Sequence, residues 1–182
     1  MLSHLDVEAG MMLDALEKRH SVRSYEDRPV EENILQEVLE AARLAPSGCD
    51  LQPWKLVVVR DRSIIRAMVH AVGGQEFIER APVLLVACMN GKGYNIGSRY
   101  DGAVVDIAIA LDHCSLQAAS MGLGTCWLGN YDGNEVRALL DIPSENPVVV
   151  IMALGYPHET APHHPRSRKA LKELVCWEKF TD

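Results

Sequence analysis

Basic residues are too scarce in this sequence to favour general nucleic-acid binding. There are 18 lysines and arginines against 25 aspartates and glutamates, which gives a formal net charge of −7. A protein that grips a nucleic-acid backbone needs a positively charged surface to displace counterions. The apolar fraction, 48% of 182 residues, is typical of a folded chain with a core. We therefore expect one globular domain over residues 1–182.

Long apolar runs are also missing, although a membrane-spanning helix needs about 20 such residues. The most apolar stretch, 104–121, is interrupted by Asp106, Asp112 and His113. The first residues include Asp6 and Glu8 and lack a basic start followed by an apolar block, so no secretory signal is expected. These absences predict a cytoplasmic protein without a membrane segment.

Paired cysteine motifs are absent as well. No Cys-x-x-Cys occurs, and the number of cysteines, five, is odd. Such a set favours reduced, mostly buried thiols over a disulfide framework or a zinc site. The five are Cys49, Cys88, Cys114, Cys126 and Cys176.

Hydrophobic periodicity predicts helices and strands that alternate along the chain. We expect helices over 7–18, from Pro29 to about Pro46, and over 61–72, 101–121 and 134–140. Apolar runs predict strands at 55–60, 83–89, 125–128 and 148–154, the first two buried on both faces. The glycine- and asparagine-rich stretch 90–99 should be a loop. This pattern indicates an α+β or α/β domain with a sheet covered by helices.

Two segments carry more apolar surface than one small chain can easily cover. The expected helix 101–121 is apolar on nearly all sides, so it should lie at the centre of the domain or in a subunit interface. The segment beyond Pro165 holds Leu171, Leu174, Val175, Trp177 and Phe180. That much apolar surface is rarely left in water. The tail should therefore pack on other protein.

Two basic clusters could hold a phosphate. In the first, Arg19, Ser21 and Arg23 offer guanidinium forks and a hydroxyl within five residues. The second contains Arg166 and Arg168 near the end of the chain. A solvated surface or a helix-capping role is the plainer interpretation of each cluster taken alone.

Two further segments are suited to a flat ligand. The stretch 45–54 is rich in turn formers, yet it carries Asp50 and Gln52 beside an expected strand, where ligands often sit. The stretch 122–129 has three glycines around a short strand, which permit close approach to the backbone. Its spacing is not that of the dinucleotide fingerprint. Ordinary connecting loops are the alternative for both.

Taken together and in this order, the segments resemble the nitroreductase family of FMN-dependent enzymes. Arg-His-Ser-Val-Arg-Ser-Tyr is similar to the opening motif of that family, and Pro-Ser-Gly-Cys-Asp-Leu-Gln-Pro-Trp is similar to its Pro-Ser-x-x-Asn-x-Gln-Pro-Trp loop. Gly-Leu-Gly-Thr-Cys-Trp-Leu-Gly, Gly-Tyr-Pro at 155–157 and Arg-Ser-Arg-Lys complete the set. The resemblance covers residues 11–175, nearly the whole chain.

The resemblance implies an α+β fold, with a mixed central sheet flanked by helices, in an intertwined homodimer with two FMN molecules at the interface. It implies that the helix 101–121 builds the dimer core. The first basic cluster would contact the phosphate, ribityl chain and flavin edge, and the C-terminal one would close on the phosphate. Pro46, Ser47 and Asp50 would come from the partner subunit, and Leu128 and Gly129 would lie by the isoalloxazine ring. The cofactor-binding residues implied are Arg19, His20, Ser21, Arg23, Pro46, Ser47, Gly48, Asp50, Gln52, Leu128, Gly129, Arg166 and Arg168.

Two departures from the family pattern bear on activity. The family usually has asparagine where this chain has Asp50. An ionised aspartate only accepts hydrogen bonds, and its charge disfavours the negatively charged reduced flavin. The stretch from Met89 to Tyr100 is short, whereas larger members place a substrate-covering insertion there.

The resemblance implies an oxidoreductase in which NADH or NADPH reduces the flavin and a small acceptor, such as a nitroaromatic or a quinone, takes the electrons in a ping-pong cycle. No acid–base residue is expected, since protons can come from solvent. Two alternatives stay open: a flavin specialist on the same fold, dehalogenase-like or flavin-fragmenting, and a non-catalytic flavin-binding module.

Overall fold

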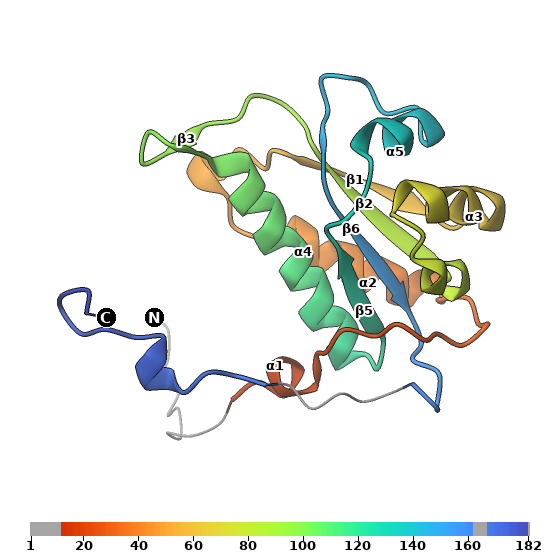
Figure 1. Ribbon diagram of the computed structural model, residues 1–182, viewed down its shortest axis with the longest axis horizontal. Coiled ribbons are helices and arrows are strands. Elements are labelled where there is room, and N and C mark those ends of the chain that lie inside the picture. The colour runs from red at the N-terminus through yellow and green to blue at the C-terminus, as the bar shows by residue number, and fades with distance from the viewer. Residues whose placement is uncertain (1–11, 162–166, 182) are drawn as a thin grey trace.

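A four-stranded sheet with helices on both faces forms the body of the computed structural model, which describes residues 12–161 and 167–181 (Figure 1). The helices are α1 (Asp14–Lys18), α2 (Glu32–Arg43), α3 (Arg62–Ala71), α4 (Gly102–Ser120) and α5 (Gly133–Leu139), with 3₁₀ turns η1 (Gly48–Asp50), η2 (Glu76–Arg80) and η3 (Leu171–Glu173). The strands are β1 (Trp54–Val59), β2 (Val83–Met89), β3 (Asn95–Ile96), β4 (Tyr100–Asp101), β5 (Gly124–Leu128) and β6 (Val148–Gly155).

The sheet has the strand order β1-β2-β6-β5, and each neighbouring pair is antiparallel. Within the described residues, its one parallel pairing is an isolated bridge between Ser21 and Thr125 of β5. The segment that follows α1 therefore supplies the parallel pairing that makes the sheet mixed, as predicted. The α+β class is confirmed.

Alternation along the strands builds two cores, one on each face of the sheet. Leu84 and Val86 of β2 point into the core that α3 and α5 cover. Val83 and Leu85 point into the core that α2 and α4 cover. This two-residue period is the ordinary pleat of a strand. The result is three layers, with α4 and the sheet meeting face to face (Figure 1).

The helix starts follow from local capping chemistry. The Asp61 carboxylate accepts from the backbone N–H groups of Ser63 and Ile64 and begins α3. Asp132 caps α5 in the same way. Such caps satisfy donors that the first turn of a helix leaves without partners.

Three predictions made from the sequence need correction. Strand β1 contacts a core on each face, as predicted, through Val57 and Val59 on one side and Leu56 and Val58 on the other, but only Val59 is fully buried. The helix expected over 7–18 begins at Asp14, after two non-helical residues, and residues 7–11 lie outside the described residues. The stretch 90–99 is mostly loop, but it contributes β3 to a short two-stranded ladder.

Helix α4 is buried on one side only within its own chain. Ile107 and Leu111 are fully buried, whereas Val104 and Val105 are each 43% exposed. By length and composition alone α4 could cross a membrane, but half of its apolar window is buried inside the chain, as in the core helix of a globular protein. The expectation that it is covered all round is therefore not met by one chain.

The C-terminal segment extends away from the layered body (Figure 1). Trp177 is 80% exposed and Phe180 is 88% exposed. The predicted packing of this tail is not made against the described residues of its own chain.

Candidate functional site

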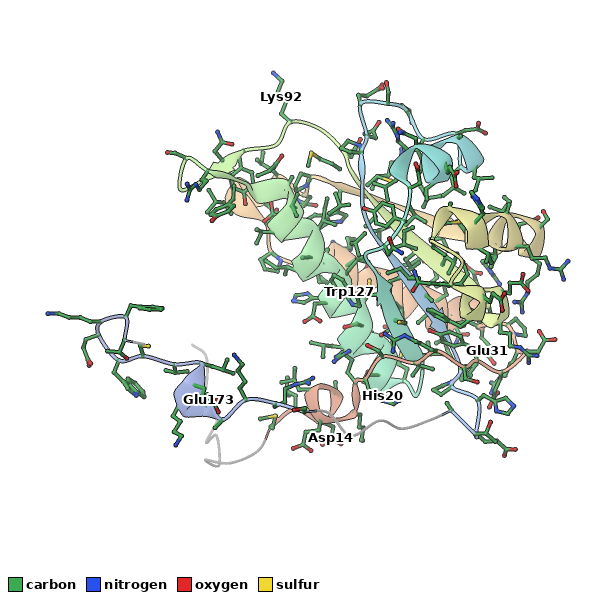
Figure 2. All side chains as sticks on the ribbon, viewed as in Figure 1. Asp14, His20, Glu31, Lys92, Trp127 and Glu173 are labelled. Atoms are coloured by element: carbon green, nitrogen blue, oxygen red, sulfur yellow. The ribbon has the colours of Figure 1, made fainter. Side chains whose placement is uncertain are left out.

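Arg19 of the first basic cluster and the glycine-rich segment 122–125 line one cleft, whereas Ser21 and Arg23 are not among its lining residues. Arg19 and His20 form part of a hollow of about 450 Å³ whose other walls include residues 122–125 and Pro157. His20 lies below the C-terminal end of α4 in the view of Figure 2, and its ring Nδ1 is 3.0 Å from the Lys18 carbonyl oxygen. The sequence therefore brings a guanidinium, an imidazole and glycine-flanked backbone to one concave surface.

The cleft exists because two segments far apart in sequence pack without space for a side chain between them. The Val22 N–H donates to the Thr125 carbonyl at 2.9 Å. A Cβ on Gly124 would lie 2.5 Å from Cγ2 of Val22, so only glycine allows this approach. The buried Tyr25 hydroxyl then donates to the Val22 carbonyl at 2.7 Å, which fixes the far side of the segment.

The loop 46–52 has an unusual backbone. Cys49, Asp50 and Gln52 adopt left-handed φ angles of 51°, 55° and 48°. Residues other than glycine occupy this region at a cost, and such residues concentrate at functional sites. The Ser47 hydroxyl oxygen accepts from the Gln52 N–H at 2.9 Å, and the Gln52 side-chain amide donates to Asp50 Oδ1 at 3.0 Å. The loop therefore presents an exposed carboxylate on a locally braced turn.

A buried carboxylate holds this loop from behind. Asp106 lies in α4 and is only 3% exposed. Its Oδ1 and Oδ2 accept from the Gly48 N–H, each at 3.3 Å, and Oδ1 accepts from the Tyr94 hydroxyl at 3.0 Å. Burial and the bond to Asp106 raise the pKa of Tyr94 above its ordinary value. Neither residue was predicted from the sequence as part of a site, although an acidic residue inside an otherwise apolar helix was the available signal.

The cleft and the loop lie at opposite ends of α4. Gly48 contacts Asp106 near the start of the helix, whereas the cleft is lined by Ala119 near its end. Thirteen residues at about 1.5 Å each separate these positions by about 20 Å. One chain therefore does not bring its own loop and its own basic cluster to the same small ligand.

The remaining candidates take varied positions. The Leu128 side chain is buried in the core, so only its backbone can face a ligand. Gly129 is exposed, and a Cβ there would meet nothing within 4 Å, so open space lies beside its backbone. Arg23 is exposed, as is Arg168 in the C-terminal segment, while Arg166 lies outside the described residues.

Three of the five thiols lie in the core, and none of these three lines the cleft. All five cysteines are free, as predicted, and Cys88, Cys114 and Cys126 are buried. The Cys114 thiol donates to the Val38 carbonyl at 3.2 Å, and burial raises its pKa to about 12. Among residues 12–161 and 167–181, no cluster of His, Cys, Asp and Glu could hold a metal ion.

Comparison with known proteins agrees with this geometry. Residues 16–75 and 65–156 match the nitroreductase family. An NADH dehydrogenase of Thermus thermophilus is 33% identical over 88% of this chain and 92% of its own. An FMN reductase [NAD(P)H] of Bacillus subtilis is 30% identical over 85% of this chain and 69% of its own. The structure of an FMN-dependent nitroreductase from Clostridium difficile R20291 superposes with a TM-score of 0.78, 28% identity and coverage of 93% and 100%.

The cleft is lined by Glu17, Lys18 and Arg19 as well as by the glycine-flanked segment. The comparisons define the class of protein, a flavin-dependent oxidoreductase with an α+β fold. The family match spans more than half of the sequence, and a relative more than 30% identical is covered almost end to end. The chain belongs to the nitroreductase family, and it is an FMN-dependent NAD(P)H oxidoreductase.

Proposed function

We propose that the protein is a homodimeric reductase that passes electrons from NADH or NADPH to a nitroaromatic or quinone in a ping-pong cycle. The observation that carries this proposal is the shared cleft of about 450 Å³, where Arg19 and His20 meet the glycine-rich segment 122–125. An anionic group on a flat ligand fits such a surface, because the charge is matched and the backbone can be approached closely.

The residues fit FMN along the edge of β5. The basic cluster lies beside Thr125, at the start of the strand. Gly129, with open space beside it, follows the end of the strand. Four residues at about 3.3 Å each separate these points by about 13 Å, the scale of an extended mononucleotide. In this proposal Arg19, Ser21 and Arg23 hold the phosphate end and Gly129 lies by the ring.

The partner subunit completes the site in this proposal. Its loop 46–52 would lie over the ring, since this loop cannot reach the cleft of its own chain. The exposed Val104 and Val105 of α4 and the apolar C-terminal tail give the surface for such a dimer. Arg166 and Arg168 would then close on the phosphate.

Bound FMN supplies reversible two-electron chemistry, which no side chain of this protein can provide. The chain's part is to bind and orient it, and to stabilise negative charge through arginines and backbone N–H groups. In a ping-pong cycle the donor binds and leaves before the acceptor binds. We place the enzyme in the cytoplasm, where nicotinamide donors are available and five free thiols stay reduced.

The direct test is spectroscopic. The purified dimer should be yellow with one FMN per chain, bleach on anaerobic addition of NADH or NADPH, and regain its colour with a nitroaromatic or quinone. Steady-state rates with both substrates varied should give parallel double-reciprocal lines. A colourless protein that fails to bind added FMN would refute the proposal, and a yellow protein that neither donor bleaches would favour a flavin-binding module.

A further inference from the structure

We propose that Asp106 is a positioning residue that holds the 46–52 loop in its ligand-facing conformation, and that Tyr94 couples the 90–101 segment to the same carboxylate. The inference rests on the proposed function, because the loop matters only if it meets a flavin of the partner subunit. The three elements involved, the loop, the segment and α4, converge at one buried carboxylate.

The contacts at this point are tight and specific. A Cβ on Gly48 would lie 2.1 Å from the Tyr94 hydroxyl oxygen, and one on Gly102 would lie 2.3 Å from the Tyr94 ring. The Tyr94 ring is therefore held between two glycine backbones, and its carbonyl accepts from the Gly102 N–H at 2.6 Å. A side chain at position 48 or 102 would therefore force the Tyr94 ring or the backbone to move.

Asp106 is placed where its carboxylate determines the loop's geometry. Its carboxylate accepts a hydrogen bond from the N–H of Gly48. Gly48 immediately precedes the left-handed residues Cys49 and Asp50. A buried charged acceptor left without these donors is costly, so the pair of bonds selects the conformation that supplies them. Movement of Tyr94 would remove one of the two donors. The 90–101 segment and the loop therefore share one anchor, and loss of the Asp106 carboxylate should release both of them.

The hydrogen bonds from Gly48 and Tyr94 to Asp106, here called the clamp, can be tested in the absence of flavin. Amide hydrogen exchange of the flavin-free protein should show faster exchange in residues 46–52 and 90–101 for Asp106→Ala. For Tyr94→Phe the larger increase should fall in residues 90–101, because the Gly48 bond remains. The control is Asp61→Ala, which removes a carboxylate that also accepts backbone N–H groups, at the start of α3. Unchanged exchange in both segments would overturn the clamp.

The second experiment measures how loss of the clamp affects FMN affinity. Asp106→Ala should weaken FMN binding by at least about tenfold, the effect of losing hydrogen bonds to a charged group. Asp106→Asn should restore most of it, since its Oδ1 can accept from Gly48 and its amide can donate to the Tyr94 oxygen. Asp61→Ala should lower thermal stability without changing the FMN dissociation constant. An Asp106→Ala affinity within twofold of wild type refutes the positioning role.

The two arms separate failure of the inference from failure of the proposed function. If wild-type protein binds no FMN, the function is wrong, and the exchange experiment alone decides whether the clamp exists. If wild-type protein binds FMN and the exchange of both segments does not respond to Asp106→Ala, the clamp is wrong and the function stands.

Discussion

Val22 packs against the backbone of Gly124 so closely that a Cβ on Gly124 would lie 2.5 Å from Val22 Cγ2. This contact joins the segment that carries Arg19 and Ser21 to the first residue of β5. It is the point at which the basic cluster acquires a fixed position relative to the sheet. The cleft proposed for the phosphate therefore depends on position 124 being a glycine.

Gly124→Ala should disturb both stability and cofactor binding. The added methyl forces Val22 or β5 to move, and overpacking of this kind costs about 1–3 kcal/mol. Gly129→Ala is the matched comparison, because a Cβ there meets nothing within 4 Å in its own chain. Gly129→Ala should leave the thermal midpoint of flavin-free protein unchanged and weaken FMN binding alone. Equal stability of the two variants would contradict the packing argument.

The sequence predicted the elements well where hydrophobic period and capping agree. Asp61, which opens the predicted helix at 61–72, caps α3, and the apolar run at 83–89 is β2 with the same limits. It overestimated how fully β1 is buried, because the cover over an edge strand depends on long-range packing that no local pattern encodes.

The candidate site was predicted in part. Turn chemistry and basic clusters pointed to the segments, but nothing local places Arg19 beside residues 122–125 or puts the 46–52 loop at the other end of α4. Asp106 was noted only as an interruption of an apolar stretch. Its role depends on Gly48, 58 positions away in sequence, and could not be seen without the fold.

Glu31 should contribute to stability in a pH-dependent way. The Tyr156 hydroxyl and the Arg28 guanidinium both donate to its carboxylate, and together they lower its pKa from 4.5 to about 2. Because the folded pKa is depressed, the stabilisation is complete above about pH 4.5 and disappears as pH falls through about 2. Glu31→Gln should therefore lower the thermal midpoint at pH 7, by less and less toward pH 2.

The matched control for Glu31 is Glu37→Gln, on the exposed face of α2. Glu37 forms no ion pair with another described residue, so its neutral variant should follow the wild-type profile at every pH. A thermal midpoint difference for Glu31→Gln that is constant from pH 7 to pH 2 would show that the side chain acts through packing rather than through charge.

The C-terminal tail should hold the dimer together. Trp177 and Phe180 are 80% and 88% exposed within their own chain. Large aromatic residues that become buried at an interface often contribute about 2 kcal/mol or more each. The double variant Trp177→Ala, Phe180→Ala should raise the dimer dissociation constant by at least tenfold, about 1.4 kcal/mol, with unchanged far-ultraviolet circular dichroism.

Analytical ultracentrifugation over a range of low concentrations measures this dissociation. Lys179→Ala provides a control in the same tail that removes no large apolar surface. Because the proposed site draws on both subunits, FMN should be lost from the double variant in parallel with dissociation. A dimer as tight as wild type would show that the tail packs elsewhere.

The last prediction concerns Asp50, where this sequence departs from its family. Its carboxylate is exposed, accepts from the Gln52 amide at 3.0 Å, and forms no ion pair with another described residue. If it lies by the partner's flavin ring, it should oppose the negative charge gained on reduction. At about 4 Å and an effective dielectric of about 20 this repulsion is at most about 4 kcal/mol. For a two-electron couple that is a limit of roughly 90 mV.

Asp50→Asn removes the charge with little other change. The side chains are nearly the same size, and asparagine tolerates the left-handed φ of 55° at this position. The variant should therefore raise the flavin midpoint potential and favour the reduced form. Asp141→Asn is a suitable control, since Asp141 has a left-handed φ of 51° on the far side of β1, in the hollow beside Lys55. Redox titration at several pH values distinguishes the outcomes. If Asp50 instead holds a ribityl hydroxyl, the potential will stay constant while FMN affinity falls, and an unchanged or lowered potential rules out the electrostatic role.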